Sequence, residues 1–151
     1  MSARLACVHV FVRDLERAAH FYTRALGLRV SHRQAGACYL TSGAAHHEIA
    51  LFEHGSEQAP PPPLAVGCRS LGFEVTSKAE LAQLCDRLGG ARATAVDNGI
   101  TWSIHTTDPD GNRIEVFCDT RHDAERSGSA RGTARALSLT ELRAAREEVF
   151  A

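Results

Sequence analysis

The sequence predicts an α+β fold: two tandem βαβββ modules that form a curved mixed sheet around a cavity, followed by a C-terminal tail helix. Three observations lead to this prediction. A strand–helix–strand pattern near the N-terminus recurs about 63 residues further on, so that Val8 corresponds to Leu71. The segments EIALFE (48–53) and RIEVFC (113–118) continue the repeat. A capped helical segment follows the second copy.

The first module begins with a strand at residues 6–12, where valines alternate with Cys7, His9 and Phe11. Asp14 is a suitable N-cap for the helix that follows, and Gly27 supplies its C-terminal stop. Further strands are expected at 37–41 and 48–53. The valines should pack beneath the helix, which leaves Cys7, His9 and Phe11 on the opposite face.

The second module repeats this pattern. Apolar side chains of its first strand alternate with Ser70, Gly72 and Glu74, and Ser77 with Glu80 forms an S-x-x-E capping box. Strands are also expected at 101–106 and 113–118. In both modules the face opposite the helix carries polar groups, and in the second it also carries a glycine. Such a face is typical of a cavity lining rather than of a dry core.

These patterns divide the chain into five segments. The modules span residues 3–57 and 66–119, and four consecutive prolines make 58–65 a stiff Pro-rich linker. Residues 120–136 have almost no large apolar side chains, so we expect a flexible tether. A helix is expected within 137–151, because Ser138 and Glu141 form a capping box. It should dock on the body of the protein or on a second subunit.

The composition excludes several classes of function. The formal net charge is -1, which gives no electrostatic basis for binding nucleic acid. No apolar run approaches the roughly 20 residues of a membrane helix, and the N-terminus lacks the apolar core of a secretory signal. The five cysteines are odd in number and widely spaced, without a C-x-x-C motif. We therefore expect reduced thiols and a cytoplasmic protein.

Four motifs in a fixed order carry a resemblance to a known family. They are HVFVRDLERAAHFYTRALGL, HHEIALF, LGFEV and DPDGNRIEVF. Together they resemble the vicinal oxygen chelate superfamily, which includes glyoxalases, bleomycin- and fosfomycin-resistance proteins and extradiol ring-cleavage dioxygenases. The resemblance spans residues 5–119 and is greatest to the extradiol dioxygenase branch. It implies a small aromatic or oxygenated substrate or ligand, and a homodimer.

The resemblance also identifies the positions of the family's active site. Family members supply two histidines and one glutamate to a divalent metal, commonly Fe(II). The corresponding residues here are Cys7, Ser70 and Glu115, so only the glutamate of the usual triad is present. A tyrosine and a histidine of the family's site correspond to His105 and Asn98, whereas His47 matches the family's acid/base histidine.

From these positions we derive a candidate site. The expected catalytic residues are His47 and His105. The expected metal ligand is Glu115, with His9 and His105 as substitutes for the missing histidines; the cofactor is a divalent metal, Fe(II) or Mn(II), or none. The residues expected to bind the ligand are Cys7, His9, Ser70, Asn98, His105 and Glu115.

Three functions remain open from the sequence. The first is a dioxygenase-like or glyoxalase-like enzyme with a divalent metal, which the overall resemblance and Glu115 favour. The second is a metal-free protein that binds a small molecule, as resistance members of the superfamily do, which the missing ligands favour. The third is a metal-independent enzyme that uses His47 or His105 as acid and base.

Overall fold

The computed structural model describes residues 3–60, 62, 66–89, 93–123 and 134–147. It confirms the α+β class, with two βαβββ modules and a C-terminal helix. The chain forms two compact units. The first contains residues 1–63 and the turn Asp108–Asn112, and the second contains residues 64–107 and 113–151. None of the described helices is long and apolar enough to span a membrane.

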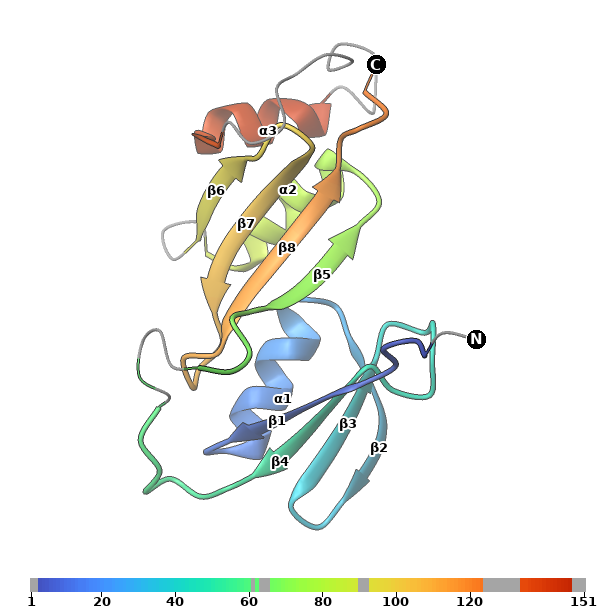
Figure 1. Ribbon diagram of the computed structural model, residues 1–151, viewed down its shortest axis with the longest axis vertical. Coiled ribbons are helices and arrows are strands. Elements are labelled where there is room, and N and C mark those ends of the chain that lie inside the picture. The colour runs from blue at the N-terminus through green and yellow to red at the C-terminus, as the bar shows by residue number, and fades with distance from the viewer. Residues whose placement is uncertain (1–2, 61, 63–65, 90–92, 124–133, 148–151) are drawn as a thin grey trace. The chain divides into compact units, whose positions relative to one another are not determined.

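The first module has one helix on one face of a four-stranded mixed sheet (Figure 1). Its elements are β1 (Val8–Val12), α1 (Leu15–Arg24), β2 (Arg29–Gln34), β3 (Ala37–Thr41) and β4 (Ile49–Glu53). The strand order is β1-β4-β3-β2. The outer strand β1 runs parallel to β4, and the remaining neighbours are antiparallel.

Strand alternation in this module follows the sequence prediction. Val10 and Val12 are buried, at 7% and 1% exposure, on the face that packs against α1. Phe11, on the opposite face, is 69% exposed. The side chain of Asp14 caps α1 by accepting a hydrogen bond from the backbone nitrogen of Arg17 at 2.9 Å. Helix packing therefore determines which side of β1 remains open.

The second module has the same connectivity, with one additional edge strand. Its elements are β5 (Leu71–Val75), α2 (Lys78–Arg87), β6 (Thr94–Asp97), β7 (Thr101–Thr107), β8 (Arg113–Asp119) and β9 (Arg135–Ala136). The strand order is β5-β8-β7-β6-β9, with β5 parallel to β8. Ser77 caps α2 by accepting from the backbone nitrogen of Glu80, whose carboxylate accepts from Thr76. In a capping box the Glu80 carboxylate accepts from the backbone nitrogen of Ser77. Here it accepts from the backbone nitrogen of Thr76, one residue earlier.

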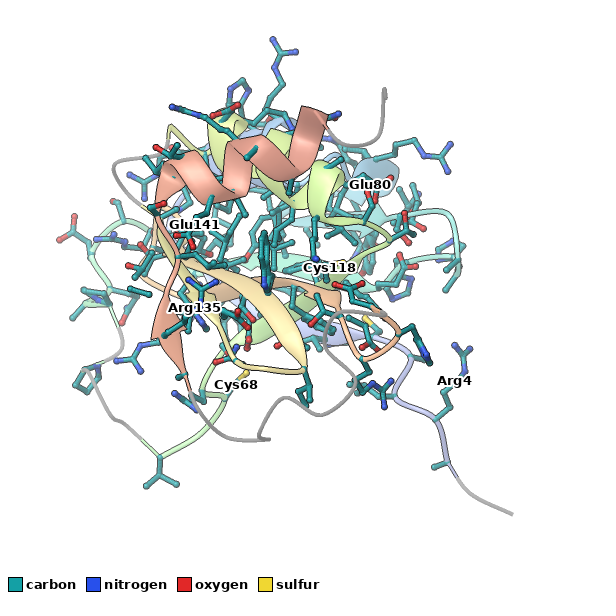
Figure 2. All side chains as sticks on the ribbon, turned by 90° about the horizontal axis from the view of Figure 1, so that it is seen from above. Arg4, Cys68, Glu80, Cys118, Arg135 and Glu141 are labelled. Atoms are coloured by element: carbon teal, nitrogen blue, oxygen red, sulfur yellow. The ribbon has the colours of Figure 1, made fainter. Side chains whose placement is uncertain are left out.

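The C-terminal helix α3 (Leu139–Glu147) packs on α2 of the second module. Ser138 and Glu141 form the complete capping box, with bonds of 2.8 and 3.1 Å. Leu137 and Leu142 are buried, at 6% and 1% exposure, as a hydrophobic staple requires. These bonds and an ion pair with Arg135 lower the pKa of Glu141 to about 2. Figure 2 labels Arg135 and Glu141.

The segment for which we expected a flexible tether, 120–136, is structured at both of its ends. Thr120 is fully buried, and Arg135–Ala136 forms β9, which pairs with β6. The physical reason is that β6 would otherwise be an edge strand with unpaired backbone groups. Residues 124–133 of this segment, and residues 61 and 63–65 of the expected linker, lie outside the described residues.

The turn Asp108–Asn112 between β7 and β8 is held by two buried carboxylates. Asp108 accepts hydrogen bonds from the Tyr22 hydroxyl at 3.0 Å and from three nitrogens of Asp110 and Asn112. Asp110 lies 2.7 Å from Arg13 Nε and 2.8 Å from Arg17 Nη2. Burial, reinforced by the charge of Asp108, raises the pKa of Tyr22. The sequence motif predicted a tight turn but not these attachments to α1.

Replacing Asp110 with Asn should lower stability by about 1–3 kcal/mol, because the Asp110 side chain loses its charge-assisted bonds to Arg13 and Arg17. Urea unfolding of the variant measures this loss. Glu57→Gln, which neutralises an exposed carboxylate in the same unit, is the control and should change stability by less than about 0.5 kcal/mol. Equal stability of the two variants would contradict a structural role for the turn.

Replacing Leu142 with Ala should destabilise the protein by about 2–5 kcal/mol, since this side chain of α3, the helix that packs on α2, is only 1% exposed. Leu139→Ala on the same helix is the matched control, because Leu139 is 36% exposed and loses much less contact. The melting temperature of each variant tests the prediction. If both substitutions have the same small effect, α3 does not contribute to the cooperative fold.

Candidate functional site

The face of the first sheet that lies away from α1 carries a cluster of aromatic rings. We call it the first open face; it contains His9 and Phe11 of β1, Tyr39 of β3 and Phe52 of β4. Ring centroids are 5.3 Å apart for His9 and Phe52 and 6.2 Å apart for Tyr39 and Phe52. An exposed patch of this kind is a common feature of ligand-binding surfaces.

Three potential metal ligands lie together at one end of this face. The ligand atoms of Cys7, His9 and His47 are all within 4.8 Å of one another. His9 is exposed, whereas Cys7 and His47 are half-buried. Cys7 and His9 share a face because they are two residues apart on an extended segment. His47 joins them because the chain leading into β4 runs beside the start of β1, where Val8 N donates to Glu48 O at 2.9 Å.

The two adjacent histidines, His46 and His47, have different environments. His46 is exposed and His47 is half-buried. Their Nδ1 atoms are 2.7 Å apart, so one ring donates a hydrogen bond to the other. The His47 ring also packs edge-on against Tyr39, at 5.1 Å between centroids. These contacts hold the imidazole of His47 in one orientation, which a group that transfers protons or binds metal requires.

Cys7 is a protonated thiol rather than an activated nucleophile in this arrangement. Burial raises the pKa of the Cys7 thiol; a backbone hydrogen bond with Ala50 partly offsets this effect, and the nearby charge of Glu48 adds to it. Reactive cysteines instead have lowered pKa values, produced by cationic neighbours or helix N-termini. In the absence of a metal, Cys7 is therefore a weak nucleophile.

The corresponding face of the second sheet carries Glu115. We call it the second open face; it contains Gly72, His105, Glu115 and Phe117, on the side away from α2. His105 is the direct cross-strand neighbour of Glu115, and Gly72 lies opposite Glu115 on β5. Glu115 is half-buried and its carboxylate has no hydrogen-bond partner among the described residues. This carboxylate is therefore available to a ligand.

Asn98 and Ser70 belong to the same module but are not cross-strand neighbours of Glu115. The amide nitrogen of Asn98 donates to Thr101 at 3.2 Å and to Ser103 at 3.0 Å, so both of its protons stabilise the β6–β7 turn. Only its oxygen remains for a ligand. Ser70 is half-buried directly before β5. Asn98 precedes β7, whereas His105 lies near the other end of that strand.

The structure thus brings the predicted residues together in two groups. Cys7, His9 and His47 are neighbours in the first unit, and His105 and Glu115 are neighbours in the second. The substitute ligand set of His9, His105 and Glu115 draws on both units and stays a prediction. Sequence reasoning did not join His47 to Cys7 and His9. The parallel pairing of β1 with β4 places the residues before Ile49 beside those before Val8. A prediction of this pairing would have placed His47 near Cys7 and His9.

Comparisons with known proteins agree with the doubled fold. A biphenyl-2,3-diol 1,2-dioxygenase of Rhodococcus globerulus, number 3, is 30% identical over 79% of this chain and 65% of its own length. A second such enzyme from that organism is 26% identical, with the same coverage. The chain thus covers less than two thirds of either relative.

A solved structure and a family profile extend the comparison. The crystal structure of a glyoxylase/bleomycin resistance protein/dioxygenase domain from Frankia sp. EAN1pec has a TM-score of 0.64 and 22% identity. It matches over 79% of this chain and 99% of that domain. The family profile matches residues 4–116, which include both modules. The chain therefore belongs to the Glyoxalase/Bleomycin resistance protein/Dioxygenase superfamily.

Proposed function

We propose that this protein binds a small aromatic, hydroxylated compound of the class that extradiol dioxygenases act on. The observation that carries the proposal is the first open face, where the rings of Phe11, Tyr39 and Phe52 lie beside the imidazoles of His9 and His47. Aromatic rings provide stacking surface, and imidazoles bind hydroxyl groups. On the second unit, Glu115 and His105 form a separate pair of polar groups that suits a phenol.

The family's usual metal set does not fit the residues of this chain. The positions that hold two histidines and a glutamate in relatives hold Cys7, Ser70 and Glu115 here. A serine hydroxyl is a neutral donor and a poor replacement for an imidazole toward Fe(II). We therefore derive no ring-cleavage step from this set, and binding is the function that the residues support best.

A second candidate function is chemistry on the bound compound without the usual metal set. The observation that favours it is the hydrogen bond between His46 and His47, which connects a half-buried imidazole to an exposed one. Such a pair suits proton transfer, with His47 facing the ligand and His46 facing solvent. His105, beside Glu115, is the other candidate for an acid or base.

The proposal includes a homodimer and a cytoplasmic location. The resemblance to the family supports the dimer. All five cysteines are free thiols, which supports a reducing compartment.

Phe11→Ala should weaken binding of catechol and 2,3-dihydroxybiphenyl roughly 2- to 10-fold, because stacking on an aromatic ring contributes about 0.5–1.5 kcal/mol. Titration calorimetry measures the dissociation constants. Phe11 is 69% exposed, so the variant should fold normally. Val66→Ala, at an exposed site of the second unit, is the control. Glu115→Gln and His105→Phe test the second open face in the same assay. Binding that none of the three substitutions changes would contradict both faces as the site.

A further inference from the structure

We propose that Cys7, His9 and His47 form a binding site for a zinc-type divalent cation, held entirely by the first module. These three residues are the one group of metal-ligand side chains in the described part of the chain whose donor atoms lie within 4.8 Å of one another. The set shares only Cys7 with the positions that hold metal in the family. It needs no residue of the second unit, so its test is independent of the proposed organic ligand.

The backbone brings the three donors close together. Cys7 and His9 project from one side of an extended segment. The parallel register of β1 and β4, with Val8 opposite Ile49, extends back to place residue 48 opposite residue 7, with His47 next to it in the chain. His9 lies on β1, whereas Cys7 and His47 lie in the segments that lead into β1 and β4, so the parallel pairing of these two strands keeps the three donors close.

Neighbouring side chains orient both imidazoles. The Nδ1 atom of His47 is engaged with His46 at 2.7 Å, which leaves its Nε2 atom for a metal. Tyr39 packs against the same ring, and Phe52 packs against the ring of His9 at 5.3 Å. Metal-binding histidines commonly have their second nitrogen hydrogen-bonded in this way, which fixes the tautomer and the direction of the lone pair.

The donor set selects the metal. One thiolate and two imidazoles suit zinc, whereas magnesium, calcium and manganese prefer oxygen ligands. Ligand atoms around a tetrahedral zinc ion lie about 3.5 Å apart, given bonds of about 2.0–2.3 Å. The present separations, up to 4.8 Å, need to close by about 1 Å. His9 is the exposed member of the set, so its side chain has the most room to move toward the other two donors.

Three protein ligands leave one position of a tetrahedral zinc ion open. Water or an oxygen donor of a ligand completes the set there. The rings of Tyr39 and Phe52 lie against the two imidazoles, so a ligand with an oxygen donor on an aromatic ring fits this position best. The thiol proton leaves to solvent when the sulfur binds the metal.

Cobalt(II) titration of the full chain, without any organic ligand, tests the proposal. We expect one equivalent to bind, with a near-ultraviolet thiolate-to-cobalt band and the visible bands of tetrahedral cobalt, and zinc should displace it. Cys7→Ser should abolish the thiolate band, and His9→Gln and His47→Gln should each weaken binding at least about tenfold. Cys68→Ser and His20→Gln, at exposed sites outside the cluster, are matched controls that should leave the spectrum unchanged.

Protection from alkylation gives an independent readout. Zinc should protect Cys7 from iodoacetamide and leave the exposed Cys68 reactive, as mass spectrometry of the modified peptides can measure. Circular dichroism and thermal unfolding of the metal-free variants confirm that they fold. A thiolate band that persists in Cys7→Ser, or metal binding that depends on Glu115 and not on His47, would overturn the proposal.

Discussion

The buried carboxylates of Asp108 and Asp110 form the interaction that holds the turn before β8, the strand that carries Glu115. Charges at 4% and 5% exposure are costly unless they are fully satisfied. Asp108 accepts hydrogen bonds from Tyr22 and Asn112, and Asp110 forms ion pairs with Arg13 and Arg17. Because β8 begins directly after Asn112, the turn fixes the residue at which strand pairing starts. A shift of one residue would turn Glu115 from the second open face toward α2.

The two modules use equivalent positions for different chemistry. His9 pairs with Ala50 in the first sheet, and Gly72 pairs with Glu115 at the same register in the second. The faces beneath α1 and α2 are apolar in both modules, since they must exclude water. The open faces have no such constraint. A Cβ on Gly72 would lie 3.7 Å from Phe117, an ordinary contact, so the second open face does not require glycine there.

Local patterns were sufficient to predict both modules because each element carries its own signal. Asp14 and Ser77 cap their helices as expected, and Ile114, Val116 and Cys118 alternate in burial with Glu115 and Phe117. The range of β2 could not be predicted in this way. All six of its residues are exposed, so the strand lacks the alternation that burial on one face produces. The two-residue strand β9 could not be predicted either, because it lies in a polar segment and is too short to show alternation.

The sequence by itself determined the repeat and the helix caps, and the family resemblance predicts that Cys7 and Ser70 replace two metal ligands. The repeat and the caps follow from residue type and short-range spacing. Only the tertiary structure decided that His47 lies beside Cys7 and His9, and that Asp110 binds Arg13 from 97 residues away. Such contacts depend on how strands pair and where a turn packs. Strand pairing and turn packing leave no periodic pattern in the sequence, because the residues in contact are brought together only when the sheets form.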